Sequence, residues 1–133
     1  GVPVDFEGPM HIHARGTTLT PGDVARYWAV AKIRYSCVDA EPGERAEDYD
    51  GTLIYIKPTY YGNEPRDVCT YANDHPAFPH EATTDQFYTE SQFESYRALG
   101  SYVMELLERT STSDERPDAS PFERLAARIR EVT

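Results

Sequence analysis

The sequence predicts an α/β-type domain of the α+β kind, in which an antiparallel hairpin packs with two to three helices. Two apolar runs of strand length, 27–35 and 52–57, flank an acidic stretch and predict the hairpin. Two longer stretches, 64–75 and 90–109, carry helix-start signals and apolar residues at helical spacing. A chain of 133 residues has the size of one domain and can bury roughly two-thirds of its unfolded surface, enough for a core.

The three expected strands differ in how far their residues are expected to be buried. Val2–Phe6 can form a short edge strand, since Pro3 suits an edge and not a centre. Tyr27–Tyr35 alternates, with an apolar or aromatic face and a second face that becomes basic at its end. Thr52–Lys57 is apolar on both faces until Lys57, which predicts a place inside the sheet and not at its rim.

The stretch between the hairpin strands is acidic. Residues 36–50 hold six carboxylates and one arginine. A solvated loop, an acidic recognition loop and a calcium site are the alternatives, although the D-x-D-x-D-G pattern of a calcium loop is absent. The net charge of −10 makes nucleic acid an unfavourable partner.

The helical stretches have recognisable start signals. Asn63 or Glu64 can cap the helix at 64–75. A short helical turn is expected at Thr84–Tyr88, preceded by Thr83. The pattern Thr89-x-x-Gln92 is a capping box that predicts a main helix from Glu90 to Arg109. Its expected packing face consists of Phe93, Tyr96, Gly100, Val103 and Leu107.

Gly100 falls within this main helix, where glycine costs about 1 kcal/mol relative to alanine. We therefore expect another backbone to approach closely at Gly100. For domain organisation, the sequence predicts one globular domain, or the C-terminal part of one, over 1–109. A polar flexible linker is expected at 110–119 and a short amphipathic tail helix at 120–133, with a capping box at Ser120.

One cluster of polar residues is a candidate site, because strand ends and helix starts are expected to meet there. Its members are Lys57, His75, His80, Glu81, Asp85, Gln86 and Arg97. A histidine beside carboxylates can do acid–base work near neutral pH. The alternative is that these groups cap helices and form structural ion pairs with Lys57 and Arg97.

Other chemistry has little support in the sequence. The nucleophile elbow G-x-S-x-G, a Gly-rich phosphate loop, C-x-x-C and H-E-x-x-H are absent, so no catalytic residue and no cofactor is predicted. His11 and His13 could share a strand face as metal ligands, but no third ligand lies nearby, and no metal site is predicted. Cys37 and Cys69 are expected to be reduced thiols.

Four runs in order resemble a known family. They are IRY (33–35) followed by GTLIYIKP (51–58), GNEP (62–65) followed by Asp67 and Val68, HPAFPHEATTDQF (75–87), and SQFESYRALG (91–100). Over about residues 2–100 the chain resembles the C-terminal region of large bacterial patatin-like phospholipase-family proteins.

The resemblance implies an acyl hydrolase with a Ser–Asp dyad as the parent protein. In that family the serine lies in G-x-S-x-G and the aspartate in D-G-G or D-G-A, both ahead of the region seen here. Asp50-Gly51-Thr52 is not the aspartate motif, so no dyad residue is carried over. The hairpin is then expected to extend a larger patatin-like sheet, with the remainder of the longer chain as partner and a lipid or acyl group as substrate.

The resemblance also implies a location on the cytoplasmic side, with membrane association through the parent chain. The sequence itself has no targeting or transmembrane segment. The alternative to a hydrolase segment is an independent, non-catalytic module that binds a protein or a ligand through the acidic loop or the tail helix.

Overall fold

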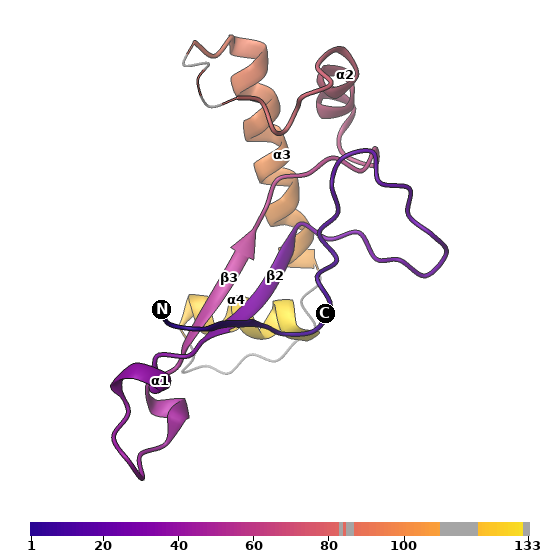
Figure 1. The fold of residues 1–133 in the computed structure, drawn as a ribbon. Coiled ribbons are helices and arrows are strands. Elements are labelled where there is room, and N and C mark those ends of the chain that lie inside the picture. Colours follow the sequence, from indigo (N-terminus) through magenta and orange to yellow (C-terminus); the bar gives the residue numbers. More distant parts are fainter. Residues whose placement is uncertain (83, 85–86, 110–119, 132–133) are drawn as a thin grey trace. The chain divides into compact units, whose positions relative to one another are not determined.

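The computed structural model describes residues 1–82, 84, 87–109 and 120–131. Within these residues the fold is α+β, with a three-stranded antiparallel sheet and four α-helices (Figure 1). This confirms the predicted fold class. The chain divides into two compact units that alternate along the sequence. The first contains Gly1–His11, Trp28–Ile56 and the C-terminal helix, and the second contains Ile12–Tyr27 and Lys57–Arg109.

The sheet belongs to the first unit and has the order β1-β2-β3. Its strands are β1 (Val4–Phe6), β2 (Trp28–Ile33) and β3 (Gly51–Ile56). Directly paired residues share a face of a sheet, so the register divides the side chains into two sets. We call one set the aromatic face: Val4, Phe6, Ala29, Ala31, Ile33, Leu53 and Tyr55. We call the other the helix face: Asp5, Trp28, Val30, Lys32, Thr52, Ile54 and Ile56.

β2 is the central strand, and the prediction that Thr52–Lys57 lies inside the sheet is wrong. Val30 and Ala31 of β2 face opposite sides and are only 1% and 0% exposed. Tyr55 and Ile56 of β3 are 38% and 40% exposed, and no strand among the described residues pairs with the outer side of β3. The apolar pattern correctly identified a strand. It could not show that β1 would pair with β2 and leave β3 at the edge.

Helix α4 (Pro121–Glu131) covers the helix face of the sheet. The Ser120 side chain accepts a hydrogen bond from the Glu123 backbone N–H, and Glu123 accepts one from the Ser120 N–H, as the capping box predicts. Ala126 and Ile129 are buried, and α4 packs on β2 (Figure 1). The predicted tail helix therefore docks on this chain's own sheet.

The acidic segment between β2 and β3 is largely exposed. It contains two short elements, α1 (Ser36–Asp39) and the 3₁₀ turn η1 (Ala46–Asp48). Neither has a buried residue. These exposures agree with the solvated loop, one of the alternatives above.

The second unit is built on two helices that pack together, α2 (Arg66–Asp74) and α3 (Glu90–Arg109). Thr89 and Gln92 exchange the two hydrogen bonds of the predicted capping box at the start of α3. Phe78 is fully buried in this unit and contacts Tyr71 and Tyr96 edge-on. Phe87 and Tyr88 are not helical. The rest of the short turn predicted near Thr84, and the linker 110–119, fall largely outside the described residues.

The packing face predicted for α3 is partly wrong. Its buried residues are Gln92, Ser95, Leu99, Val103 and Leu107. Phe93 is 60% exposed, and a Cβ at Gly100 would meet nothing within 4 Å. The true stripe begins with polar residues. The predicted face was chosen from hydrophobic residues alone, so it is rotated around the helix from the buried face. Gln92 and Ser95 belong to the buried face because they are buried through hydrogen bonds.

Candidate functional site

The predicted polar cluster lies in the second unit, and the structure brings only part of it together. Glu81 is its best-connected member: its carboxylate accepts hydrogen bonds from Gln92 Nε2 at 2.7 Å and from the Tyr71 hydroxyl at 3.3 Å. These bonds tie the segment after Phe78 to both α2 and α3. Burial, with smaller effects from Glu81, raises the pKa of Tyr96 to about 12. Glu81 is thus a structural acceptor among phenols and an amide.

His75 closes the C-terminal end of α2. Its ring stacks on Tyr71, with centroids 3.8 Å apart, and its Nδ1 lies 3.0 Å from the Tyr71 carbonyl. Because a carbonyl oxygen only accepts, Nδ1 carries the hydrogen in this contact. This arrangement fixes the imidazole against its own helix and agrees with the capping alternative.

The remaining members of the cluster are dispersed. His80 lies in the electrostatic range of Lys57, and burial followed by the Lys57 charge lowers the pKa of His80. Arg97 pairs with Glu94 one turn away on the exposed side of α3. Asp85 and Gln86 lie outside the described residues. The predicted acid–base group is therefore not assembled among the described members.

Arg15 is a connecting residue that sequence reasoning missed. Its guanidinium donates hydrogen bonds to the backbone carbonyls of Ala72, His75 and Phe78, and it lies 4.9 Å from the Tyr60 ring centroid. Ala72 is among the last four residues of α2, whose carbonyls lack helical partners, and a cation at this end is also favoured by the helix dipole. Arg15 thereby fastens the 12–27 segment to the helical part of the second unit. Because it lies in a polar loop, no sequence pattern marked it.

Glu64 is a second residue whose role differs from the prediction. It does not cap α2, whose N-cap is Pro65 without a side-chain bond. Instead its buried carboxylate accepts hydrogen bonds from the Tyr27 hydroxyl at 2.6 Å and from the backbone N–H groups of Tyr61 and Gly62, both at 2.8 Å. Burial and this bond to Glu64 raise the pKa of Tyr27.

Tyr61 extends the Glu64 network to the 12–27 segment. Its hydroxyl donates to the Arg26 carbonyl at 2.8 Å and accepts from the His13 backbone N–H at 3.0 Å. The backbone of His13 is thus used for structure, and the described residues contain no group of three or more side chains suited to a metal ion. The network joins these segments inside the second unit, although the buried His13 Nε2 and Arg26 Nε have no hydrogen-bond partner among the described residues.

A groove of about 770 Å³ lies on the second unit beside α2. Its lining residues are Arg66, Asp67, Thr70, Tyr71, Asp74, His75 and Ser91. The lining contains two carboxylates and one guanidinium, and the Thr70 hydroxyl donates to the Arg66 carbonyl. The groove is open and its lining surface is more apolar than polar, and it holds one member of the predicted cluster, His75.

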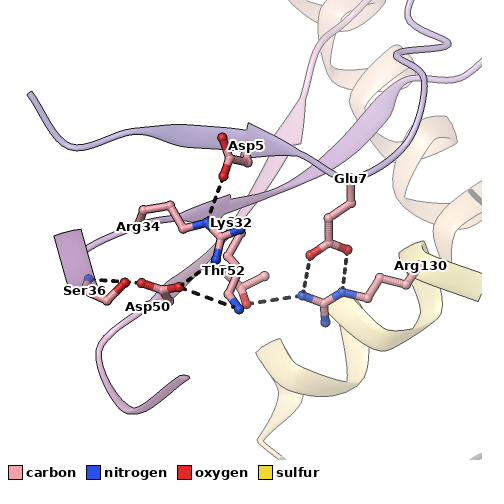
Figure 2. A network of polar contacts seen from close by, with 8 residues as sticks. All are labelled: Asp5, Glu7, Lys32, Arg34, Ser36, Asp50, Thr52 and Arg130. Carbon is pink, nitrogen blue, oxygen red and sulfur yellow. Dashed lines mark hydrogen bonds and ion pairs between the residues drawn. The ribbon is translucent and has the colours of Figure 1, made fainter. Parts of the chain in front are cut away.

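The first unit has a polar network of its own, shown in Figure 2. Asp50, at the base of the hairpin, accepts from the Ser36 backbone N–H at 3.0 Å and pairs with Arg34 at 3.3 Å and Lys32 at 3.6 Å. Its side chain is fully buried. The hydrogen bonds to Ser36, followed by those to Arg34 and the charge of Lys32, hold the pKa of Asp50 below its usual range.

A second part of the same network holds α4 on the sheet. Arg130 donates to both carboxylate oxygens of Glu7, at 2.8 and 3.2 Å, and to the Thr52 hydroxyl at 3.4 Å (Figure 2). Arg34 also reaches Asp5 of β1 at 2.8 Å. Each of the carboxylates Asp5, Glu7 and Asp50 pairs with a cation, so the network joins strands and helix.

Comparison with protein-family models, curated proteins and solved structures finds no match. The function of the chain therefore has to be argued from its residues. Cys37 and Cys69 are free thiols, as predicted. None of the helices formed by the described residues is both long enough and apolar enough to cross a membrane. The two networks and the Arg15 contacts hold segments of this chain in place.

Proposed function

We propose that this chain is the C-terminal structural part of a patatin-like lipid acyl hydrolase and that the Ser–Asp dyad lies elsewhere in the same protein. The four runs that resemble the family supply the sequence basis. Lipid or acyl substrate would bind to the hydrolase part, with this segment supporting its sheet. The chain contributes no nucleophile, since no G-x-S-x-G motif is present in it.

One observation supports the structural role most directly: polar residues of the runs join separate segments through hydrogen bonds that are buried or partly buried. Glu64, from the second run, accepts from Tyr27 and Tyr61, which lie outside the runs. Glu81 of the third run binds Gln92 of the fourth at 2.7 Å. The polar residues of these runs are thus used to join segments, which is what a supporting element requires and a catalytic site does not.

The parent reading frame tests this proposal. We expect the coding sequence upstream to contain G-x-S-x-G and D-G-G or D-G-A, and the encoded protein to hydrolyse long-chain acyl esters. Deleting the segment described here should abolish that hydrolysis, while replacing the elbow serine by alanine should abolish it without unfolding the protein. A reading frame without either motif would contradict the proposal.

The second candidate is an independent binding module. The groove beside α2 favours it, because its charged lining could hold a polar ligand. A reading frame that lacks hydrolase motifs would leave this candidate standing. It then predicts that Asp74→Ala weakens ligand binding without lowering the melting temperature.

A further inference from the structure

Arg26 is a buried cation that no carboxylate of the described residues balances. The residue is only 9% exposed, and its Nε atom is buried without a hydrogen-bond partner among the described residues. The arginines that do form ion pairs in the described part of the chain have side chains at least 38% exposed: Arg34, Arg45, Arg97, Arg109 and Arg130. The charge with the least access to water is thus the one without a counter-charge.

This arrangement is unfavourable for the folded chain. Moving a charged group out of water costs free energy unless an opposite charge or hydrogen bonds replace the lost water. Burial lowers the pKa of Arg26, and no neighbouring charge among the described residues acts against it. A guanidinium nevertheless stays protonated in proteins, so the residue cannot avoid the cost by losing its charge. An anion is the group that would offset it.

A second buried nitrogen without a partner belongs to the same region of the second unit. It is His13 Nε2, which has no hydrogen-bond partner among the described residues. The Tyr61 hydroxyl oxygen lies 2.8 Å from the Arg26 carbonyl and 3.0 Å from the His13 backbone nitrogen. Thr59, which is fully buried, donates to the His13 carbonyl at 2.9 Å. The backbones of both residues are therefore held in place, and an imidazole Nε2 that carries a hydrogen is a donor.

We propose that Arg26 binds a small oxyanion, a carboxylate or a phosphate, and that His13 contributes a second N–H donor to it. The planar guanidinium matches the oxygen atoms of both anions and forms charge-assisted hydrogen bonds with them. The small exposed fraction of Arg26 admits a small group and not a protein surface. The net charge of −10 also opposes an acidic protein or a second copy as the source of the anion. The inference is independent of the proposed function, since it uses neither the family resemblance nor a hydrolase.

Melting temperatures of the 133-residue chain in sodium phosphate and in sodium acetate, compared with chloride at the same ionic strength and pH, test the site. A ligand that binds only the folded state raises the melting temperature with increasing concentration. We expect this rise for the wild-type chain with at least one of the two anions, and the responding anion identifies the oxyanion class. Arg26→Met should lose the rise and should be at least as stable as wild type in chloride, because it removes an unbalanced buried charge.

Arg97→Met, which alters an exposed arginine, is the matched control and should respond as the wild type does. General effects of phosphate on folding act equally on all three chains, so the difference between chains reports the site. A wild-type chain that responds no more than Arg26→Met would overturn the proposal. An equal loss of the response in Arg97→Met would also overturn it, by showing an adventitious ion only.

Nuclear magnetic resonance of the wild-type chain decides the question even if Arg26→Met fails to fold. The nitrogen-15 signals of Arg26 Nε and His13 Nε2 should both move during titration with the responding anion and level off at the same concentration. Arg26→Lys, which keeps the charge but loses the planar fork, should bind at least about tenfold more weakly. An Arg26 Nε signal that does not move with either anion would refute the site. A moving Arg26 signal beside an unmoved His13 signal would refute the role of His13.

Discussion

Glu64 holds the interior of the second unit together at the level of a single side chain. One buried carboxylate satisfies a phenol and two backbone N–H groups. Replacing such an acceptor leaves buried donors without a partner, and that costs more than the net value of the bonds themselves. The residue thereby links the 12–27 segment, which supplies Tyr27, to the turn before α2.

Glu64→Gln should destabilise the chain by about 2 kcal/mol, because the new amide N–H₂ faces a donor at one of the two former acceptor positions. Urea unfolding followed by circular dichroism measures the change. Glu108→Gln, which alters an exposed carboxylate on α3, is the matched control and should be neutral. Equal stabilities of the Glu64→Gln and wild-type chains would show that the carboxylate has no structural role.

Asp50 makes the stability of the first unit depend on pH. Its pKa in the folded chain lies below the ordinary value of 3.8, chiefly through its hydrogen bonds to Ser36. The unfolded state therefore takes up the proton first as pH falls. The stabilising contribution is complete well above pH 3.8 and is lost as the pH falls through the lower folded value.

Asp50→Asn should remove that part of the acid dependence. The wild-type chain is expected to lose more stability between neutral pH and about pH 2 than the variant does. Urea midpoints at several pH values measure it, with Asp39→Asn, an exposed acid in the same segment, as control. Parallel pH profiles for wild type and Asp50→Asn would contradict the role assigned to the Asp50 contacts.

At the scale of the elements, the order of the strands in the sheet determines which substitutions destabilise the chain most. β2 is buried on both faces, whereas β3 keeps one edge and part of each face in water. A charge placed at Val30, which is 1% exposed, has no access to solvent, while one in β3 can turn toward it.

Val30→Asp should therefore cost more than about 4 kcal/mol and unfold the chain, whereas Ile54→Asp should cost about 1–2 kcal/mol. Thermal melts of the two variants compare them directly. If the two substitutions proved equally severe in the 133-residue chain, β3 would be as buried as β2, and the strand order described here would be incorrect.

A substitution at Gly100 tests whether this side of α3 is exposed. A methyl group there meets no atom within 4 Å in the described structure. Gly100→Ala should therefore stabilise the 133-residue chain by about 1 kcal/mol through helix propensity. A higher melting temperature is the expected result, with exposed Ser101→Ala as a reference on the same helix. A lower melting temperature would mean that something packs closely at Gly100.

The elements could largely be predicted from sequence, and their burial could not. The two hairpin strands, the bounds of α3 and both capping boxes follow from local patterns that act within a few residues. The edge position of β3 depends on β1, far away in the chain. Likewise, the exposure of Phe93 depends on Gln92 and Ser95 being buried through hydrogen bonds, which hydrophobicity does not report.

The candidate site could be predicted only as a list of polar residues. Glu81 and His75 were selected, and the structure uses both as structural groups. Arg15 and the acceptor role of Glu64 were missed, because each acts on segments distant in the sequence. Periodicity and spacing describe neighbours on one element. They carry no information about which loop a long side chain reaches.

For the whole molecule, the two units alternate along the chain, so neither is a contiguous segment. Each unit is closed by long-range polar contacts: Arg130 with Glu7 in the first, and Arg15 with the end of α2 in the second. These contacts join segments that are distant in the sequence, and they hold each unit together.

Ester hydrolysis by the 133-residue chain, measured beside the protein of its full reading frame, tests this account most directly. We expect no hydrolysis of p-nitrophenyl esters above the blank by the 133-residue chain, and turnover by the longer protein that is lost when its elbow serine becomes alanine. Hydrolysis by the 133-residue chain itself would contradict the account, as would a longer protein without a serine-dependent activity.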